Sequence, residues 1–181
     1  MDCKTKGIEL AWLLRHDKQA FNDGLIDSHG WRDCQELINN HGFTMETIEN
    51  IVKTNNKKRF EFNDDQTKIR ARQGHSINVD VELKEETPPK ILYHGTSLER
   101  VESILKNGIN NGGRLHVHLT ESFATALKSG QRHGVPMVVE VNALDANNDG
   151  VKFLHSANDV WLTEFVDPKY INRITNKLDR I

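Results

Sequence analysis

The sequence predicts an α+β protein of two lobes, on three observations. The first half carries three segments with helical periodicity, followed by two short runs with strand-like alternation. An acidic stretch at residues 79–90, which ends near Pro88-Pro89, interrupts this pattern and indicates a linker. Beyond it, most apolar runs are short and lack the helix–strand alternation of a parallel sheet. We therefore expect lobes at residues 1–85 and 86–181.

The first lobe is expected to contain three helices and a hairpin. The helices are expected at residues 8–16, 32–40 and 45–53, and the first should bury an apolar stripe formed by Ile8, Ala11, Trp12 and Leu14. Arg15 and His16 end that helix. Two cations suit a helix C-terminus, and the same position would let them project donors into a cleft.

Residues 59–62 and 68–71 alternate and enclose a polar turn, which predicts the hairpin. Three helices followed by a hairpin is the winged-helix arrangement, in which a basic wing commonly meets a phosphate backbone. Six basic residues in and around the hairpin therefore form a candidate polyanion surface: Lys57, Lys58, Arg59, Arg70, Arg72 and His75.

The second lobe is expected to begin with a buried strand that ends in His94-Gly95-Thr96. The apolar run starts directly after the proline pair, and Thr96 or Ser97 can cap a helix at residues 98–106. This arrangement would place His94 and the backbone of Gly95 at a strand end, facing a crevice. An ordinary strand-to-helix turn would explain the same three residues.

The rest of the second lobe is expected to be mostly antiparallel. Residues 114–120 alternate, which puts four polar residues on one strand face: Arg114, His116, His118 and Thr120. A helix is expected at residues 121–128, a loop at 130–134, a strand at 137–141, and a hairpin from 153–156 and 160–163.

Composition excludes several classes of protein. With 24 basic and 26 acidic side chains, the chain cannot coat nucleic acid by bulk charge, so any polyanion must meet a local basic cluster. Cys3 and Cys34 provide neither a disulfide framework nor zinc-ligand spacing. No run approaches membrane-spanning length and the N-terminus lacks a signal-like apolar segment, so we expect a cytoplasmic protein without membrane partners.

Several chemistries lack their residues. His116 and His118 could ligate a metal, but no neighbouring Cys or carboxylate pair completes a site, so no metal is expected. There is no Gly-x-Ser-x-Gly elbow, no P-loop and no Cys-His pair. Basic groups at the ends of elements remain, and such groups suit the binding of phosphate and the stabilisation of charge during its transfer.

The sequence resembles the RNA 2′-phosphotransferase family, the KptA proteins, from about residue 10 to residue 170. Eight segments match in family order: Leu13-Leu14-Arg15-His16, Gly30-Trp31, Asn56-Lys57-Lys58-Arg59-Phe60, Ile69-Arg70-Ala71-Arg72-Gln73-Gly74-His75-Ser76, Leu92-Tyr93-His94-Gly95-Thr96, Arg114-Leu115-His116-Val117-His118-Leu119, Arg132-His133-Gly134 and Val160-Trp161-Leu162. One departure is Asp159, where relatives often have Gly; Asp tolerates the same left-handed turn.

The resemblance implies a winged-helix lobe joined to an ADP-ribosyltransferase-like, NAD-binding lobe. It implies removal of an internal RNA 2′-phosphate, such as one left at a tRNA splice junction, with NAD+ as co-substrate. An RNA 2′-phospho-ADP-ribose intermediate would give 2′-OH RNA, nicotinamide and ADP-ribose 1′′,2′′-cyclic phosphate. We expect the protein to act as a monomer.

The resemblance also assigns residues. The family's catalytic group corresponds to Arg15, His16, Arg59 and Arg114, which are expected to converge on one phosphoryl group. Lys57, Arg70 and His75 are candidates for binding the substrate phosphate or RNA. Five residues are candidates for binding NAD+: His94, Gly95, Thr96, Arg132 and His133.

Two alternatives stay open at the level of sequence. The protein could be a winged-helix RNA-binding protein with an inactive transferase lobe, which would bind RNA without consuming NAD+. It could also ADP-ribosylate terminal phosphates of nucleic acids, because any phosphate monoester can act as the nucleophile. Each arginine could instead serve only a surface salt bridge, which contributes little to stability.

Overall fold

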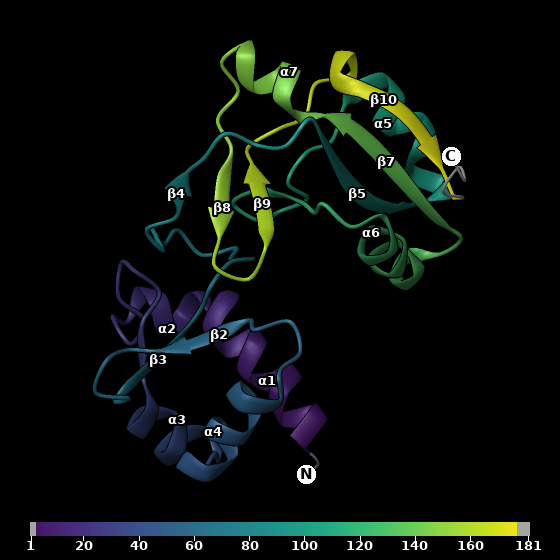
Figure 1. Cartoon of the computed structure of the whole chain (residues 1–181). Coiled ribbons are helices and arrows are strands. Elements are labelled where there is room, and N and C mark those ends of the chain that lie inside the picture. The colour runs from purple at the N-terminus through teal and green to yellow at the C-terminus, as the bar shows by residue number, and fades with distance from the viewer. Residues whose placement is uncertain (1–2, 177–181) are drawn as a thin grey trace. The chain divides into compact units, whose positions relative to one another are not determined.

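The computed structural model describes residues 3–176, and their side chains from residue 5 onward. Helices and antiparallel sheets make up the chain (Figure 1), in agreement with the expected α+β class. Its contacts divide it into two compact units, Met1–Leu83 and Lys84–Ile181. The sequence-based boundary lies after residue 85; in the structure, Lys84–Glu85 form strand β4, which pairs with β8 of the second unit.

The first unit combines four helices with a small sheet. Its elements are α1 (Cys3–Arg15), α2 (Lys18–Asn22), β1 (Arg32–Asp33), α3 (Cys34–His41), α4 (Met45–Thr54), β2 (Phe60–Phe62) and β3 (Lys68–Ala71). The sheet has the order β1-β3-β2 and is antiparallel throughout. The expected hairpin is therefore confirmed, and β1 adds a short third strand to it.

Side-chain caps set where the short helices begin. Asp33 accepts hydrogen bonds from the backbone N–H groups of Gln35 and Glu36, so α3 starts at Cys34 and not at residue 32 as expected. Thr44 caps α4 in the same way by accepting from Thr47 N–H. Cys34 is buried, and this burial raises the pKa of its thiol to about 11.

The buried stripe of α1 differs from the expected one. Leu10, Leu13 and Leu14 form it, at the spacing of one helical face, and they pack in the core of the first unit. Leu14 was expected in the stripe and Ala11 packs against the same core, but Ile8 and Trp12 are 66% and 53% exposed, so their assignment to the stripe was wrong. The two possible stripes differ by about half a turn, and only tertiary contacts decide between them.

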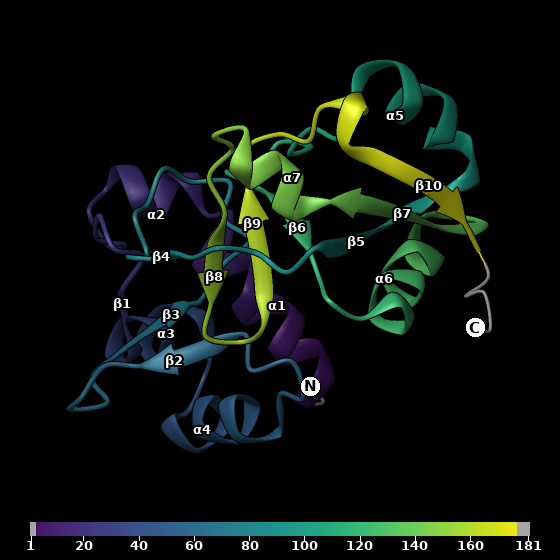
Figure 2. The same ribbon diagram turned by 45° about the horizontal axis from the view of Figure 1, so that its top comes forward.

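The second unit contains two sheets. Its elements are β4 (Lys84–Glu85), β5 (Ile91–Ser97), η1 (Leu98–Arg100), α5 (Val101–Asn107), β6 (Val117–Leu119), α6 (Phe123–Gly130), η2 (Gln131–His133), β7 (Pro136–Asn142), α7 (Ala143–Asn148), β8 (Leu154–Ser156), β9 (Val160–Thr163), η3 (Pro168–Tyr170) and β10 (Ile171–Thr175). One sheet has the order β10-β7-β5 and the other β4-β8-β9-β6, with all pairs antiparallel. Figure 2 shows the β8–β9 hairpin beside the longer strands.

Three expectations for the second unit need correction. Strand β6 spans only Val117–Leu119, so the expected polar face keeps His118, while Arg114 and His116 precede the strand. The preceding turn at Gly112 and Gly113, both with positive φ, delays the strand. A side-chain cap from Thr96 or Ser97 was expected for the helix after β5. The element after β5, η1, begins after Ser97 without a side-chain cap hydrogen bond.

His94, Gly95 and Thr96 lie within β5 and not at its end. The strand continues to Ser97, and His94 pairs with Val139 of β7. Thr96 is buried. In contrast, the turn at Asp159 agrees with expectation, because its φ of 59° is left-handed.

Helix α6 packs directly on β5 because two glycines allow it. A Cβ placed on Gly95 would collide with the carbonyl oxygen of Ala126 in α6, and one placed on Gly130 would collide with that of Thr96 in β5. The backbones of helix and strand therefore touch without a layer of side chains between them. Among the residues of the structure, every helix is too short or too polar to cross a bilayer.

Replacing Gly95 by Ala should destabilise the protein by about 1–3 kcal/mol or more, because the backbone of α6 must move away. Thermal or urea unfolding measures this loss. Gly7→Ala is the matched control: its Cβ would lie 3.7 Å from Ile51 in ordinary contact, so a helical alanine should slightly stabilise the protein. Equal effects of the two substitutions would contradict the packing role of Gly95.

Candidate functional site

Arg15 and His16 lie where α1 ends, and one serine holds both residues. The backbone N–H of Ser76 donates to the carbonyl oxygen of Arg15 over 2.9 Å. The Oγ of the same serine lies 3.0 Å from Nδ1 of His16. This pair of contacts fixes the end of the helix and the plane of the imidazole together.

Gly74 provides space for the Arg15 side chain. Its φ is +90°, and a Cβ placed there would lie 3.4 Å from Cζ of the guanidinium. A residue with a Cβ would be strained by this backbone conformation, while its Cβ would be in ordinary van der Waals contact with Arg15. Gly74 and Ser76 belong to a matched segment, but they were not predicted as site residues. The pattern that could have indicated them is a histidine flanked by a glycine and a serine.

Arg59 joins the same neighbourhood through the chain that follows β3. Its carbonyl oxygen accepts a hydrogen bond from Arg72 N–H over 2.9 Å, two residues before Gly74. Residues 72–76 extend over at most roughly 14 Å. The first unit thus brings the backbones of three predicted catalytic residues, Arg15, His16 and Arg59, along one short segment.

The other basic candidates of the first unit have different settings. Lys57 is exposed in the turn before β2. Arg70 is paired with Glu61 over 2.7 Å and lies 4.3 Å from the ring centre of Trp31. His75 is only 2% exposed. Arg70 and His75 are therefore integrated in the fold, and their contact with RNA stays a prediction.

His94 is held neutral in the second unit. Its Nδ1 lies 3.0 Å from the carbonyl oxygen of His118, so this nitrogen carries the proton. Burial lowers the pKa of the ring, the hydrogen bond to His118 offsets part of this effect, and electrostatic interaction with Arg100 and His133 lowers the pKa further. A neutral imidazole with Nδ1–H has Nε2 as an acceptor.

Arg114 belongs to the same electropositive region. Arg114 is exposed; partial desolvation lowers its pKa and the charge of Arg132 adds to this effect, although an arginine stays protonated. Arg132 and His133 are neighbours in η2; the charge of Arg132 acts on Arg114, and that of His133 acts on His94. The carboxylate of Glu99 lies beside the same segment, 2.9 Å from where a Cβ of Gly134 would be. Sequence reasoning missed Arg100, which carries no motif signal. Such a concentration of like charge suits an anionic ligand.

Gly95 and Thr96 already have a structural task, because they form the contact between β5 and α6. Their contact with a ligand stays a prediction. Within residues 3–176, no group of three or more His, Cys, Asp or Glu side chains is arranged to hold a metal ion.

Comparison with known proteins adds an independent line of argument. Residues 5–165 match the family described as RNA 2′-phosphotransferase, Tpt1 / KptA family. A probable RNA 2′-phosphotransferase from Acaryochloris marina is 42% identical over 177 residues, covering 94% of this chain and 97% of the relative. One from Fusobacterium nucleatum is 45% identical over 178 residues, with coverage of 94% and 99%.

The partly buried His94 predicts a pH-dependent stability. Its pKa in the folded protein lies below 6.5, so near pH 6 the unfolded chain binds a proton that the folded protein does not. The free energy of unfolding should fall as pH drops through that value and level off below the folded pKa. His94→Gln should weaken this dependence in urea titrations between about pH 7 and about pH 5. Identical slopes for the two proteins would contradict the assignment.

Proposed function

Because this chain belongs to the RNA 2′-phosphotransferase, Tpt1 / KptA family, we propose that it transfers an internal 2′-phosphate from RNA to NAD+. The family match, which covers most of the chain, is the observation that carries this proposal. The basic groups in the two units support it, because the reaction involves a phosphate and a dinucleotide, both anionic.

The proposed chemistry has two steps. An oxygen of the RNA 2′-phosphate attacks C1′′ of the nicotinamide ribose, the glycosidic C–N bond breaks, and nicotinamide leaves. The 2′′-hydroxyl of that ribose then attacks phosphorus, losing its proton. The bond from phosphorus to the RNA 2′-oxygen breaks, that oxygen takes up a proton, and ADP-ribose 1′′,2′′-cyclic phosphate is released.

Arg15, His16, Arg59 and Arg114 are the proposed catalytic residues. A phosphate dianion is already a nucleophile, so the first step depends mainly on positioning. The second step places extra negative charge on the oxygens of phosphorus, and guanidinium groups stabilise that charge through paired hydrogen bonds. We assign assistance in proton transfer to His16, and the contact of its ring with Ser76, which orients the ring, supports this role.

The electropositive region of the second unit supports NAD+ as co-substrate. We place the pyrophosphate near Arg132 and His133, and the nicotinamide ribose near the strand that carries His94. Neutral His94 can accept a hydrogen bond from a ribose hydroxyl through Nε2. In this proposal Gly95 and Thr96 fix the strand on which the dinucleotide lies.

The family resemblance also leads us to propose the fold of each lobe of the protein. A winged-helix first lobe is supported by the helices of the first unit and by the β2–β3 hairpin with β1 beside it. An ADP-ribosyltransferase-like second lobe is supported by its two antiparallel sheets.

The experiment uses a short RNA with one internal 2′-phosphate, incubated with the protein with and without NAD+. We expect dephosphorylated RNA, nicotinamide and ADP-ribose 1′′,2′′-cyclic phosphate only when NAD+ is present. Binding without NAD+ consumption would identify an RNA-binding protein instead. Labelling of a terminal phosphate with ADP-ribose, and no loss of the internal one, would identify an ADP-ribosyltransferase of nucleic-acid ends.

Arg59→Ala and Arg114→Ala should slow the second step by about 10²–10³-fold, because each removes a donor to the charged phosphorus. RNA 2′-phospho-ADP-ribose should then accumulate, which gel electrophoresis and mass spectrometry detect. Arg173→Ala is the matched control, since Arg173 is a partly exposed arginine of β10 paired with Glu140. Product formation at the normal rate by either catalytic variant would exclude that residue from the second step.

A further inference from the structure

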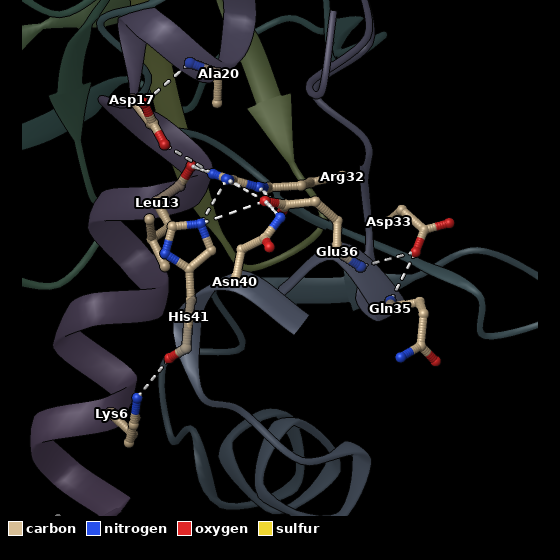
Figure 3. A network of polar contacts seen from close by, with 10 residues as sticks. All are labelled: Lys6, Leu13, Asp17, Ala20, Arg32, Asp33, Gln35, Glu36, Asn40 and His41. Atoms are coloured by element: carbon tan, nitrogen blue, oxygen red, sulfur yellow. Dashed lines mark hydrogen bonds and ion pairs between the residues drawn. The ribbon is translucent and has the colours of Figure 1, made fainter. Parts of the chain in front are cut away.

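A buried arginine outside the proposed site organises the first unit. Arg32 is only 1% exposed and is among the largest fully buried side chains of the protein. It pairs in β1 with Ile69 of the hairpin, while its guanidinium reaches toward the helices (Figure 3). A buried charge is costly unless ion pairs and hydrogen bonds compensate it.

The guanidinium makes compensating contacts through all three nitrogens. Nη1 donates to the carbonyl oxygen of Leu13 over 3.0 Å and to Oδ2 of Asp17 over 2.9 Å. Nε and Nη2 donate to the two carboxylate oxygens of Glu36 over 2.6 and 3.1 Å. Nη2 also lies 2.9 Å from Nε2 of His41 (Figure 3).

Two of these contacts are with residues that flank the proposed catalytic pair, Arg15 and His16, in the sequence. Leu13 lies two residues before Arg15, and Asp17 directly follows His16. The carbonyl groups in the last turn of a helix lack the amide donors of a following turn, and Arg32 supplies a donor to that of Leu13. Asp17 caps α2 by accepting from Ala20 N–H, so Arg32 also holds the start of the next helix.

Only an arginine can make this arrangement. Lysine offers one nitrogen, whereas the planar fork of arginine serves Leu13 and Asp17 on one side and Glu36 on the other. Burial disfavours the charged form of Arg32, but its hydrogen bonds to Glu36 and Asp17 outweigh this effect and raise its pKa. The cation also lies at the C-terminal end of α1, where the helix dipole favours positive charge.

We propose that Arg32 is a positioning residue for Arg15 and His16 in the phosphotransfer reaction. It acts through the ends of α1 and α2 and does not contact the substrate. It holds both ends of the junction between α1 and α2, while Ser76 holds the junction itself. The inference rests on the proposed function, because Arg15 and His16 matter only if they act on the phosphate.

Arg32→Met tests the proposal, with Lys6→Met as the matched control. Lys6 also connects α1 to α3, through the carbonyl oxygen of His41, but it lies nine residues before Arg15. We expect Arg32→Met to lower kcat by about 10-fold or more with the KM for NAD+ little changed, because displaced catalytic groups lose transition-state contacts. Lys6→Met should keep the normal kcat. Both are measured well below their melting temperatures, with circular dichroism as the check on folding.

The imidazole of His16 provides a readout that does not depend on activity. In NMR spectra with ¹⁵N-labelled histidine, the His16 ring signals should shift in Arg32→Met and stay in place in Lys6→Met. If the wild-type protein lacks the proposed activity, this spectrum still tests the positioning. Normal kcat together with unmoved His16 signals in folded Arg32→Met would overturn the inference.

Asp17→Asn keeps the experiment decisive if Arg32→Met does not fold. Asparagine can still cap α2, but it removes the charged partner on the junction side of Arg32. We expect the same lowered kcat and shifted His16 signals, to a smaller extent. Wild-type values in both measurements would overturn the proposal.

Discussion

The end of α1 depends on donors supplied from elsewhere in the first unit. A helix that stops inside a fold leaves carbonyl groups without amide partners, and those of α1 receive donors from Arg32 and from Ser76. Both contacts lie within a few residues of Arg15 and His16. The requirement to satisfy a helix terminus and the requirement to orient the proposed catalytic pair are therefore met by the same hydrogen bonds.

In the second unit, the proposed ligand site contains several basic side chains that repel one another. Burial of His94 in β5 keeps that ring neutral, which limits the repulsion among its basic neighbours. The remaining charges lie on Arg100, Arg114 and the η2 segment. Repulsion of this kind is relieved when an anion binds, which is consistent with the proposed dinucleotide.

Local signals in the sequence predicted much of the fold. Apolar runs and turn residues located the hairpin β2–β3 and the strands β5 and β7, and the tolerance of Asp for left-handed geometry anticipated Asp159. The predicted burial of Ile8 and Trp12 in α1 was wrong, because two stripes of similar hydrophobicity compete and packing selects one. The strand predicted at residues 114–120 was longer than β6, because alternation in the sequence does not show where a glycine turn ends and the strand begins.

The site was predicted to a different degree. Motifs identified Arg15, His16 and Arg59, and the structure brings their backbones along one segment. Gly74 and Ser76 stand in a matched segment without having been assigned to the site, and Arg32 stands in none, because the contacts of all three are with groups distant in the sequence. The burial of His75 and the ion pair of Arg70 were equally hidden, since a basic residue has the same letter whether it meets solvent or a carboxylate.

The direct contact between β5 and α6 has a consequence for ligand binding. Because Gly95 and Gly130 leave no side chains between the two backbones, no rotamer change can loosen that contact. The η2 segment follows α6 without a break, so Arg132 and His133 start from main chain that is already ordered. An anion that binds there needs no ordering of the main chain, and only the exposed side chains of Arg132 and His133 have to be fixed.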